Sequence, residues 1–143
     1  MHHINKSAIV PYSCQQMYRL VNQIETYPQF LHWCTSAAIL KQTDQQITAS
    51  IKINKGVFTH TLTTVNTLTP FDNIHMQLKA GPFSDLSGDW HFTALKQAAC
   101  KVTLALTFGF SSKLMDISIS PIFAEIANAQ LDNFVERAKA VYG

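Results

Sequence analysis

The sequence predicts an α+β fold in which a curved antiparallel β-sheet of six to seven strands wraps around one long C-terminal helix. Apolar and polar residues alternate from about Thr35 to Ser111, which is typical of strands that have one wet face. Helical periodicity precedes this segment and returns after it. A length of 143 residues suits a single domain that spans residues 1–143.

The N-terminal part predicts one strand followed by two short helices. Residues 3–10 form the predicted strand, and Pro11 ends it. Ser13 stands at a helix N-cap position, ahead of an apolar stripe at helical spacing. This stripe consists of Met17, Leu20, Val21 and Ile24. A second short helix is expected over Tyr27–Leu31, after a proline break.

The central segment predicts strands whose apolar residues share one face. These alternating positions are Ala49, Ile51 and Ile53; Phe58 and Leu62; Ile74, Met76 and Leu78; Trp90 and Phe92; and Val102, Leu104, Leu106, Phe108 and Phe110. Residues that favour turns separate the strands. They are Asp44–Gln46, Lys55 with Gly56, Pro70–Asn73, and Gly81 with Pro82.

The C-terminal segment predicts the long helix. Ser120 is typical of an N-cap and Pro121 of a first helical residue, while residues 113–119 are expected to form an earlier turn of the same helix, bent at Pro121. The apolar stripe of this helix is Phe123, Ala127, Leu131, Phe134, Ala138 and Val141. Such a helix is a natural cover for the apolar face of the sheet. We expect two layers of this size to leave an apolar-lined cavity between them.

Composition narrows the classes of function. Charged residues make up 14% of the chain, against about 25% in ordinary globular proteins. The net charge is +2, which argues against a dedicated DNA-binding protein. Five lysines could contact anionic headgroups or ribosomal RNA, although a solvated surface is the simpler interpretation at this net charge. They are Lys52, Lys55, Lys79, Lys101 and Lys113.

Cysteine usage and hydropathy indicate a cytoplasmic protein. The three cysteines, Cys14, Cys34 and Cys100, form an odd set without a CxxC pair, so we expect no disulfide framework. The N-terminus lacks the apolar core of a signal peptide, and no apolar run approaches about 18 residues. The segment Leu114–Ile126 has apolar residues on more than one face, which also fits peripheral contact with the inner face of the cytoplasmic membrane.

Residues that could carry chemistry do not form a catalytic or metal-binding pattern. The six histidines lack metal-site spacing, and His75 and His91 are expected on the polar faces of neighbouring strands. Cys34 lies close to His32 in the chain, but proximity in sequence does not make a dyad. Asp89, beside Trp90, is the least ordinary of the acids. We therefore predict no catalytic residue, no metal and no required cofactor.

Several strings of residues follow a known family in order from Ile4 to Tyr142. They are Val10-Pro11-Tyr12-Ser13, Met17-Tyr18-x-Leu20-Val21, Tyr27-Pro28-x-Phe30-Leu31 with Trp33-Cys34, Gly81-Pro82-Phe83-x-x-Leu86-x-Gly88-x-Trp90-x-Phe92, Phe110-Ser111-Ser112-Lys113-Leu114, and Arg137-Ala138-Lys139-x-Val141-Tyr142. Together they resemble the coenzyme Q-binding START-domain family, part of the polyketide cyclase/dehydrase and lipid-transport superfamily, and its branch of bacterial ribosome association toxins.

This resemblance implies a START-like helix-grip fold and a cavity for an apolar ligand. The leading hypothesis is a non-enzymatic lipid-binding protein that holds ubiquinone or a related isoprenoid and supports respiration. The alternative is a ribosome association toxin that binds the large ribosomal subunit and blocks subunit joining. A polyketide cyclase-like enzyme is the third. Two positions depart from the family pattern: His32 stands where proline is usual, and Gly109 where a glutamate near the cavity mouth is usual.

Twelve apolar residues of the sheet and the long helix are candidates to line the cavity, because large inward-facing side chains suit contact with a lipid. Ordinary core packing is the competing interpretation for each of them. They are Phe58, Leu62, Met76, Phe83, Trp90, Phe92, Phe108, Phe110, Met115, Phe123, Ile126 and Ala127.

Overall fold

The computed structural model describes residues 1–143, apart from the side chain of Gln97. The elements in chain order are β1 (His2–Val10), α1 (Cys14–Asn22), the 3-10 helix η1 (Ile24–Gln29), β2 (Cys34–Gln42), β3 (Gln46–Lys55), β4 (Phe58–Thr69), β5 (Asn73–Ala80), β6 (Asp85–Leu95), the 3-10 turn η2 (Lys96–Ala98), β7 (Ala99–Gly109) and α2 (Lys113–Tyr142).

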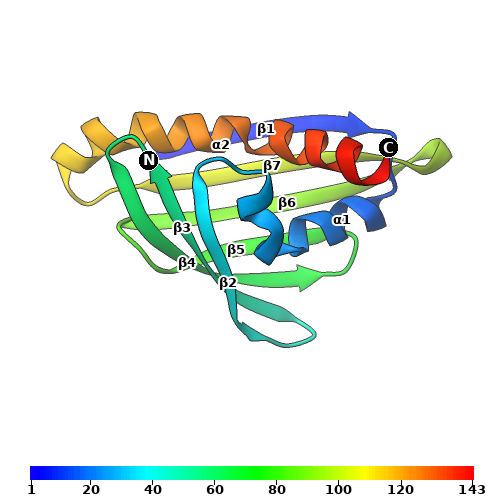
Figure 1. Ribbon diagram of the computed structural model, residues 1–143, viewed down its shortest axis with the longest axis horizontal. Helices are drawn as coiled ribbons and strands as arrows, with labels where there is room; N and C mark the ends of the chain where they lie inside the picture. Colours follow the sequence, from blue (N-terminus) through cyan, green and yellow to red (C-terminus); the bar gives the residue numbers. More distant parts are fainter.

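The seven strands form one antiparallel sheet in the order β1-β7-β6-β5-β4-β3-β2. Helix α2 extends along this sheet and packs against β1 and β7, while α1 lies near the C-terminal end of α2 (Figure 1). The predicted α+β fold is therefore confirmed, including two short helices after the first strand. The second, however, is a 3-10 helix that runs from Ile24 to Gln29 with Pro28 inside it, so the bounds predicted for it, Tyr27–Leu31, are wrong. No helix in the described chain combines the length and hydropathy needed to cross a membrane.

Local sequence explains the start of α1. Ser13 Oγ accepts a hydrogen bond from the backbone N–H of Gln16 at 3.1 Å, and Gln16 Oε1 accepts one from the Ser13 N–H at 2.9 Å. This capping box satisfies two backbone donors that the first turn leaves without partners. The predicted N-cap at Ser13 is therefore confirmed.

Helix α2 begins earlier than Ser120 and Pro121 predict. Ser112 is the N-cap, and its Oγ accepts from the backbone N–H of Met115 at 3.3 Å. Pro121 lies inside the helix, and the Ser120 hydroxyl donates to Asp116 Oδ1 at 2.9 Å. Residues 113–119 are thus part of one continuous helix, and the N-cap prediction for Ser120 is wrong because its side chain serves Asp116 instead.

Five phenylalanines pack together between the sheet and the N-terminal half of α2, and we call them the phenylalanine cluster. Its members are Phe58, Phe83, Phe108, Phe110 and Phe123. Phe58 and Phe108 have no exposed surface. Phe134, farther along α2, packs edge-on against Trp90 at 5.2 Å and Tyr27 at 5.3 Å between ring centroids. These rings hold α2 on the inner face of the sheet.

The cysteines differ from the expectation. Cys14, the first residue of α1, and Cys100 of β7 form a disulfide, with 5.2 Å between their Cα atoms. Cys34 is free and buried. The prediction of no disulfide rested on an odd count, and an odd count does not show which two of three cysteines the fold brings together.

The outer face of the sheet, which points away from α2, is polar. Strand register places hydroxyl and amide side chains opposite one another there, and several are hydrogen-bonded across strands: Ser7 to Thr103 at 3.0 Å, Thr63 to Ser50 at 3.3 Å, and Gln46 to Thr67 at 3.3 Å. The turn regions predicted between the strands all lie at the connections of the sheet, although Gln46, Lys55 and Asn73 are already strand residues.

Candidate ligand cavity

A cavity lies between the inner face of the sheet and α2. It holds about 770 Å³ of empty space, part of which opens to solvent. Its lining residues are Ile24, Tyr27, Trp33, Ala49, Ile51, Ile53, Leu62, Thr64, Asn66, Met76, Leu86, Trp90, Leu104, Leu106, Phe123, Ile126, Ala127 and Gln130. Most are apolar, and a few polar groups stand among them, which is the usual character of a small-molecule site.

Two residues that line the cavity each carry a buried polar atom without a partner. Trp33 Nε1 and Gln130 Oε1 make no hydrogen bond within the described residues, and the Trp33 side chain is only 8% exposed. By contrast, the buried Asn66 is paired, since Thr64 Oγ1 donates to Asn66 Oδ1 at 2.9 Å. A buried polar group without a partner is rare in native structures, so both atoms call for an explanation.

The cavity wall near η1 stays uncharged. The Tyr27 hydroxyl donates to the carbonyl oxygen of Val21, and burial followed by the nearby Cys34 raises the pKa of Tyr27 far above its usual range. Burial also raises the pKa of the Cys34 thiol, although a backbone hydrogen bond with Ser36 partly offsets this. Both groups are therefore protonated and neutral at pH 7.

A second hollow adjoins the cavity and is more polar. Its lining residues are His32, Trp33, Asn54, Lys55, Ile126, Ala129 and Asn133. Trp33 and Ile126 border both hollows and so form the wall between them. At its edge, Lys55 Nζ lies 3.1 Å from Glu125 Oε1, an ion pair that joins the end of β3 to α2.

The twelve sequence-predicted residues separate into two groups of six. Leu62, Met76, Trp90, Phe123, Ile126 and Ala127 line the cavity. Phe58, Phe83, Phe108 and Phe110 belong to the phenylalanine cluster, Phe92 stacks on Trp90, and Met115 is half-buried near the start of α2. Phe123 belongs to both the lining and the cluster. Whether any of these residues binds a ligand stays a prediction.

Sequence reasoning missed the polar part of the lining. Trp33 lies in the link between η1 and β2, where neither strand nor helical periodicity applies, and Gln130 resembles an ordinary polar position on α2. His32 lies beside Trp33 in the second hollow. Gly109 is elsewhere: a Cβ at this residue would meet Met1 and Ser84.

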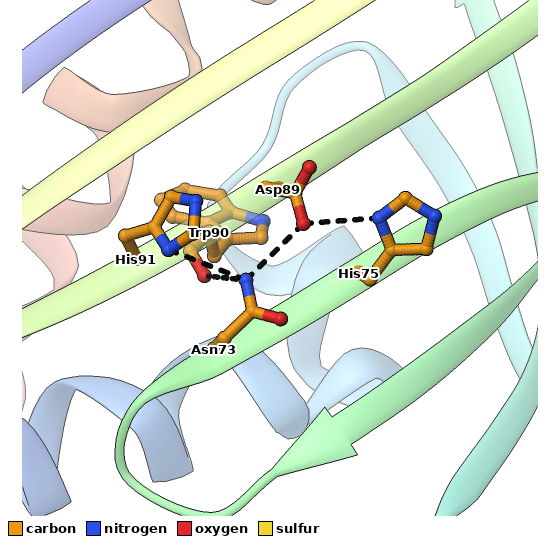
Figure 2. Close-up of polar contacts among 5 residues, drawn as sticks. All are labelled: Asn73, His75, Asp89, Trp90 and His91. Carbon is orange, nitrogen blue, oxygen red and sulfur yellow. Dashed lines mark hydrogen bonds and ion pairs between the residues drawn. The ribbon is translucent and has the colours of Figure 1, made fainter.

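Among the residues weighed for catalysis or metal binding, Asp89, His75 and His91 lie on the outer face, whereas Cys34 is buried and His32 lines the second hollow. His75 is opposite Asp89 in the sheet register, and His75 Nδ1 lies 2.9 Å from Asp89 Oδ1. Asn73 joins Asp89 and His91, with its Nδ2 at 3.2 Å from Asp89 Oδ1 and 3.4 Å from His91 Nδ1 (Figure 2). His75 and His91 are thus diagonal neighbours that Asn73 and Asp89 separate.

This outer network is a set of surface contacts. Asn73 also donates to the carbonyl oxygen of Trp90 at 2.9 Å, so it fixes the edge of β5 to β6. Over the described residues, no group of three or more histidine, cysteine and acidic side chains is placed to hold a metal ion. Both hydrogen bonds of the Asp89 carboxylate are made with residues of the adjacent strand β5, Asn73 and His75.

Comparison with known proteins identifies several relatives. Residues 10–135 match the family model described as polyketide cyclase/dehydrase and lipid transport. The chain is 44% identical to the ribosome association toxin RatA of Escherichia coli K12, covering 99% of this chain and 90% of that protein. It is 40% identical to RatA of Pseudomonas aeruginosa, covering 99% and 98%. The coenzyme Q-binding protein COQ10 homolog B of Xenopus laevis is 21% identical, covering 97% and 59%.

Solved structures share the fold at low identity. The Zhui aromatase/cyclase from Streptomyces sp. R1128 has a TM-score of 0.86 at 14% identity, covering 96% of this chain and 93% of that one. A START superfamily protein from Mycobacterium smegmatis has a TM-score of 0.83 at 14% identity, covering 99% of each chain. These likenesses establish the START-like architecture.

Proposed function

The chain belongs to the polyketide cyclase/dehydrase and lipid transport family, and we propose that it acts as a ribosome association toxin. In this proposal it binds the large ribosomal subunit in the cytoplasm and blocks its joining to the small subunit. The observation that carries the proposal is identity of 40–44% over 99% of the chain with proteins that bear this name. The action requires binding alone, without turnover.

The outer face of the sheet is the surface that best suits ribosomal RNA. Exposed Lys52, Lys79 and Lys101 point away from the cavity, among threonine, serine and asparagine side chains. Two acids, Asp85 and Asp89, lie on this face, and Asp89 is already in contact with His75. Lysines and hydroxyl groups are common partners of RNA phosphates, so this face offers both the charge and the donors needed.

Sedimentation tests this proposal directly. Purified protein is mixed with isolated large subunits, small subunits are then added, and the products are separated on sucrose gradients. We expect the protein to sediment with large subunits, the joined ribosome to decrease, and both effects to weaken as salt rises. Absence of sedimentation with large subunits at low salt would overturn the proposal.

A charge variant locates the contact. Replacing Lys52, Lys79 and Lys101 with glutamine removes three positive charges from the outer face, and we expect weaker binding with a shallower salt dependence. The matched control replaces Lys6, Lys113 and Lys139, which removes the same charge elsewhere. Equal weakening by both variants would show that the outer face is not the contact surface.

A second function is favoured by a separate observation, the apolar cavity. We propose that it holds ubiquinone or a related isoprenoid, without chemical turnover, in support of respiration. The family description includes lipid transport, and the Xenopus relative is named for binding coenzyme Q. Burial of apolar area contributes about 25 cal/mol per Å², so a lipid tail can bind with few polar contacts.

Mass spectrometry of an organic extract from natively purified protein tests this second function. A stoichiometric quinone or isoprenoid would support it and name the ligand. Protein that carries no lipid, and that also fails to take up added ubiquinone, would overturn it while leaving the ribosome proposal intact. Turnover of a polyketide by the same protein would instead favour a cyclase.

A further inference from the structure

Two unpaired polar atoms at the cavity indicate what kind of polar group its ligand carries. This inference rests on the second proposed function, the binding of a lipid. Trp33 Nε1 is a donor only, and it has no partner among the described residues although its side chain is 92% buried, the complement of its 8% exposure. Gln130, on α2, lines the same cavity, and its Oε1 is also buried without a partner among the described residues. Two residues that line one space, Trp33 in the link before β2 and Gln130 on α2, thus each carry an unpaired polar atom.

We infer that the cavity binds an uncharged amphiphile whose polar head accepts a hydrogen bond from Trp33 Nε1 and lies against the Gln130 amide. A carbonyl oxygen or a hydroxyl group supplies the acceptor that Trp33 lacks. The amide of Gln130 can turn to offer either its oxygen or its N–H₂ group, so it accommodates both kinds of head. Such a ligand would complete two hydrogen bonds that the protein leaves open.

The lining shows why the head is uncharged. The described lining residues include no lysine, arginine, histidine, aspartate or glutamate, and Tyr27 stays protonated because burial raises its pKa. A carboxylate or phosphate in this space would lose its hydration without gaining a counter-charge. A neutral head loses far less hydration free energy when it enters the cavity, and the hydrogen bond from Trp33 replaces one that the head made to water.

The position of Trp33 gives the direction in which the ligand lies. Trp33 and Ile126 separate the cavity from the more polar second hollow, where His32, Lys55 and Asn133 face solvent. Far across the sheet, Leu86 of β6 and Leu104 and Leu106 of β7 supply apolar lining. The head therefore rests beside the second hollow, and the tail extends toward β6 and β7.

Four probes with alkyl chains of similar length distinguish the heads: 1-dodecanol, decylubiquinone, dodecane and sodium dodecanoate. Their dissociation constants are measured by displacement of Nile red. For the unmodified protein we expect 1-dodecanol and decylubiquinone to bind more tightly than dodecane, and dodecanoate to bind most weakly. Tightest binding of dodecanoate would overturn the assignment of an uncharged head.

The variant Trp33→Phe removes the N–H group and keeps an aromatic ring. We expect its affinity for 1-dodecanol and decylubiquinone to fall about three- to tenfold, the worth of one hydrogen bond, with little change for dodecane. Trp90→Phe is the matched control, since Trp90 lines the same cavity and its Nε1 is not among the buried unpaired atoms. Trp90→Phe should change the affinity for all four probes by a similar factor.

Stability gives a second readout. Trp33→Phe loses ring packing but also removes an unpaired buried N–H, so its melting temperature should fall less than that of Trp90→Phe. A separate measurement avoids substitution: the indole N–H resonance of Trp33 should shift when 1-dodecanol is added and stay in place with dodecane.

Two failures are distinguishable. If the unmodified protein binds none of the four probes, the lipid-binding function itself is overturned. The other failure is that the protein binds the probes, but Trp33→Phe lowers the affinity for all of them equally and the indole N–H resonance shifts alike with every probe. In that case only the hydrogen-bonded orientation is overturned.

Discussion

The two faces of the same sheet differ in how their side chains are held. On the inner face, Phe58, Ile53 and Phe108 have no exposed surface and lie in a continuous apolar core. On the outer face, Thr63, Thr103 and their neighbours hydrogen-bond across strands in contact with water. Neighbouring residues of a strand therefore have different requirements. An inner-face side chain must fit the apolar core, whereas an outer-face side chain must be hydrated and hydrogen-bonded to its neighbours.

This difference separates stability from recognition. Apolar packing on the inner face supplies most of the stabilisation, so changes there should mainly affect the free energy of unfolding. Surface substitutions usually change that free energy by less than about 0.5 kcal/mol, so outer-face variants can test ribosome binding without unfolding the protein.

The largest effect is expected at Phe134 of α2, whose fully buried ring packs against Trp90 on the inner face of the sheet. Phe134→Ala removes a fully buried ring that contacts Tyr27, Phe30 and Trp90, and should lower the free energy of unfolding by about 3–5 kcal/mol in urea titrations. Phe71→Ala, at a side chain that is 39% exposed, is the control. Equal losses for the two variants would contradict the packing difference.

Neighbouring residues of β4 test the two faces directly. Leu62 faces the cavity and is 6% exposed, so Leu62→Ala should lower the free energy of unfolding by about 2 kcal/mol, at the low end for this change because the cavity already leaves contacts unmade. Thr63→Ala, on the outer face, should change it by less than about 0.5 kcal/mol. A larger loss at Thr63 would show that the outer hydrogen bonds carry unexpected stability.

Two glycines sharpen the comparison. A Cβ at Gly88 would lie 2.7 Å from a methyl group of Leu106 and 2.8 Å from the carbonyl oxygen of Ala105, so Gly88→Ala should destabilise the protein by about 1–3 kcal/mol. At Gly109 the nearest atom is the sulfur of Met1, at 3.3 Å, and the flexible side chain can move away. Thermal unfolding should therefore leave Gly109→Ala close to the unmodified protein, and a reversed order would refute this account.

The smallest effect concerns Asp116, which joins α2 to β1. Hydrogen bonds from His2 and then Ser120 hold the pKa of Asp116 below its ordinary value of 3.8. A carboxylate whose pKa is lowered by folding stabilises the protein above pH 3.8, and this contribution is lost as the pH falls through the lowered pKa. Asp116→Asn should slightly reduce the melting temperature at neutral pH, with the difference vanishing in acid. A constant difference at every pH would exclude this origin.

Much of the fold could be predicted from periodicity. Alternation along β3 to β7 is a local property of each strand, and it identified the inner face correctly at Ile51, Leu62 and Trp90. The end of α2 could be located in the same way. Its start could not, because Ser112 and Ser120 are both plausible caps, and the sequence does not show which of them caps the helix and which bonds to Asp116 one turn earlier.

The cavity was harder to predict. Alternation shows which face of the sheet a residue lies on, but not whether its side chain lines the cavity or packs in the core. Phe83 and Phe110 face inward, yet their rings stack at 4.7 Å between centroids and fill space instead of lining it. Trp33 was recognised only as part of a family string, because it lies in an irregular link where periodicity assigns no face, and its proposed role depends on a missing partner. Pairing of Cys14 with Cys100 depends likewise on tertiary proximity across 86 positions.

The place of β1 in the sheet has a consequence for biosynthesis. Every other neighbouring pair of strands is consecutive in the chain, but Val10 pairs with Cys100 and His2 with Phe108. At translation rates of about 5–20 residues per second, β1 waits about 5–20 seconds for its partner strand to be made. During that interval Ile4, Ala8 and Val10 have nothing to pack against, so the nascent chain passes through a period in which chaperones, or another unfinished copy, can bind its first strand.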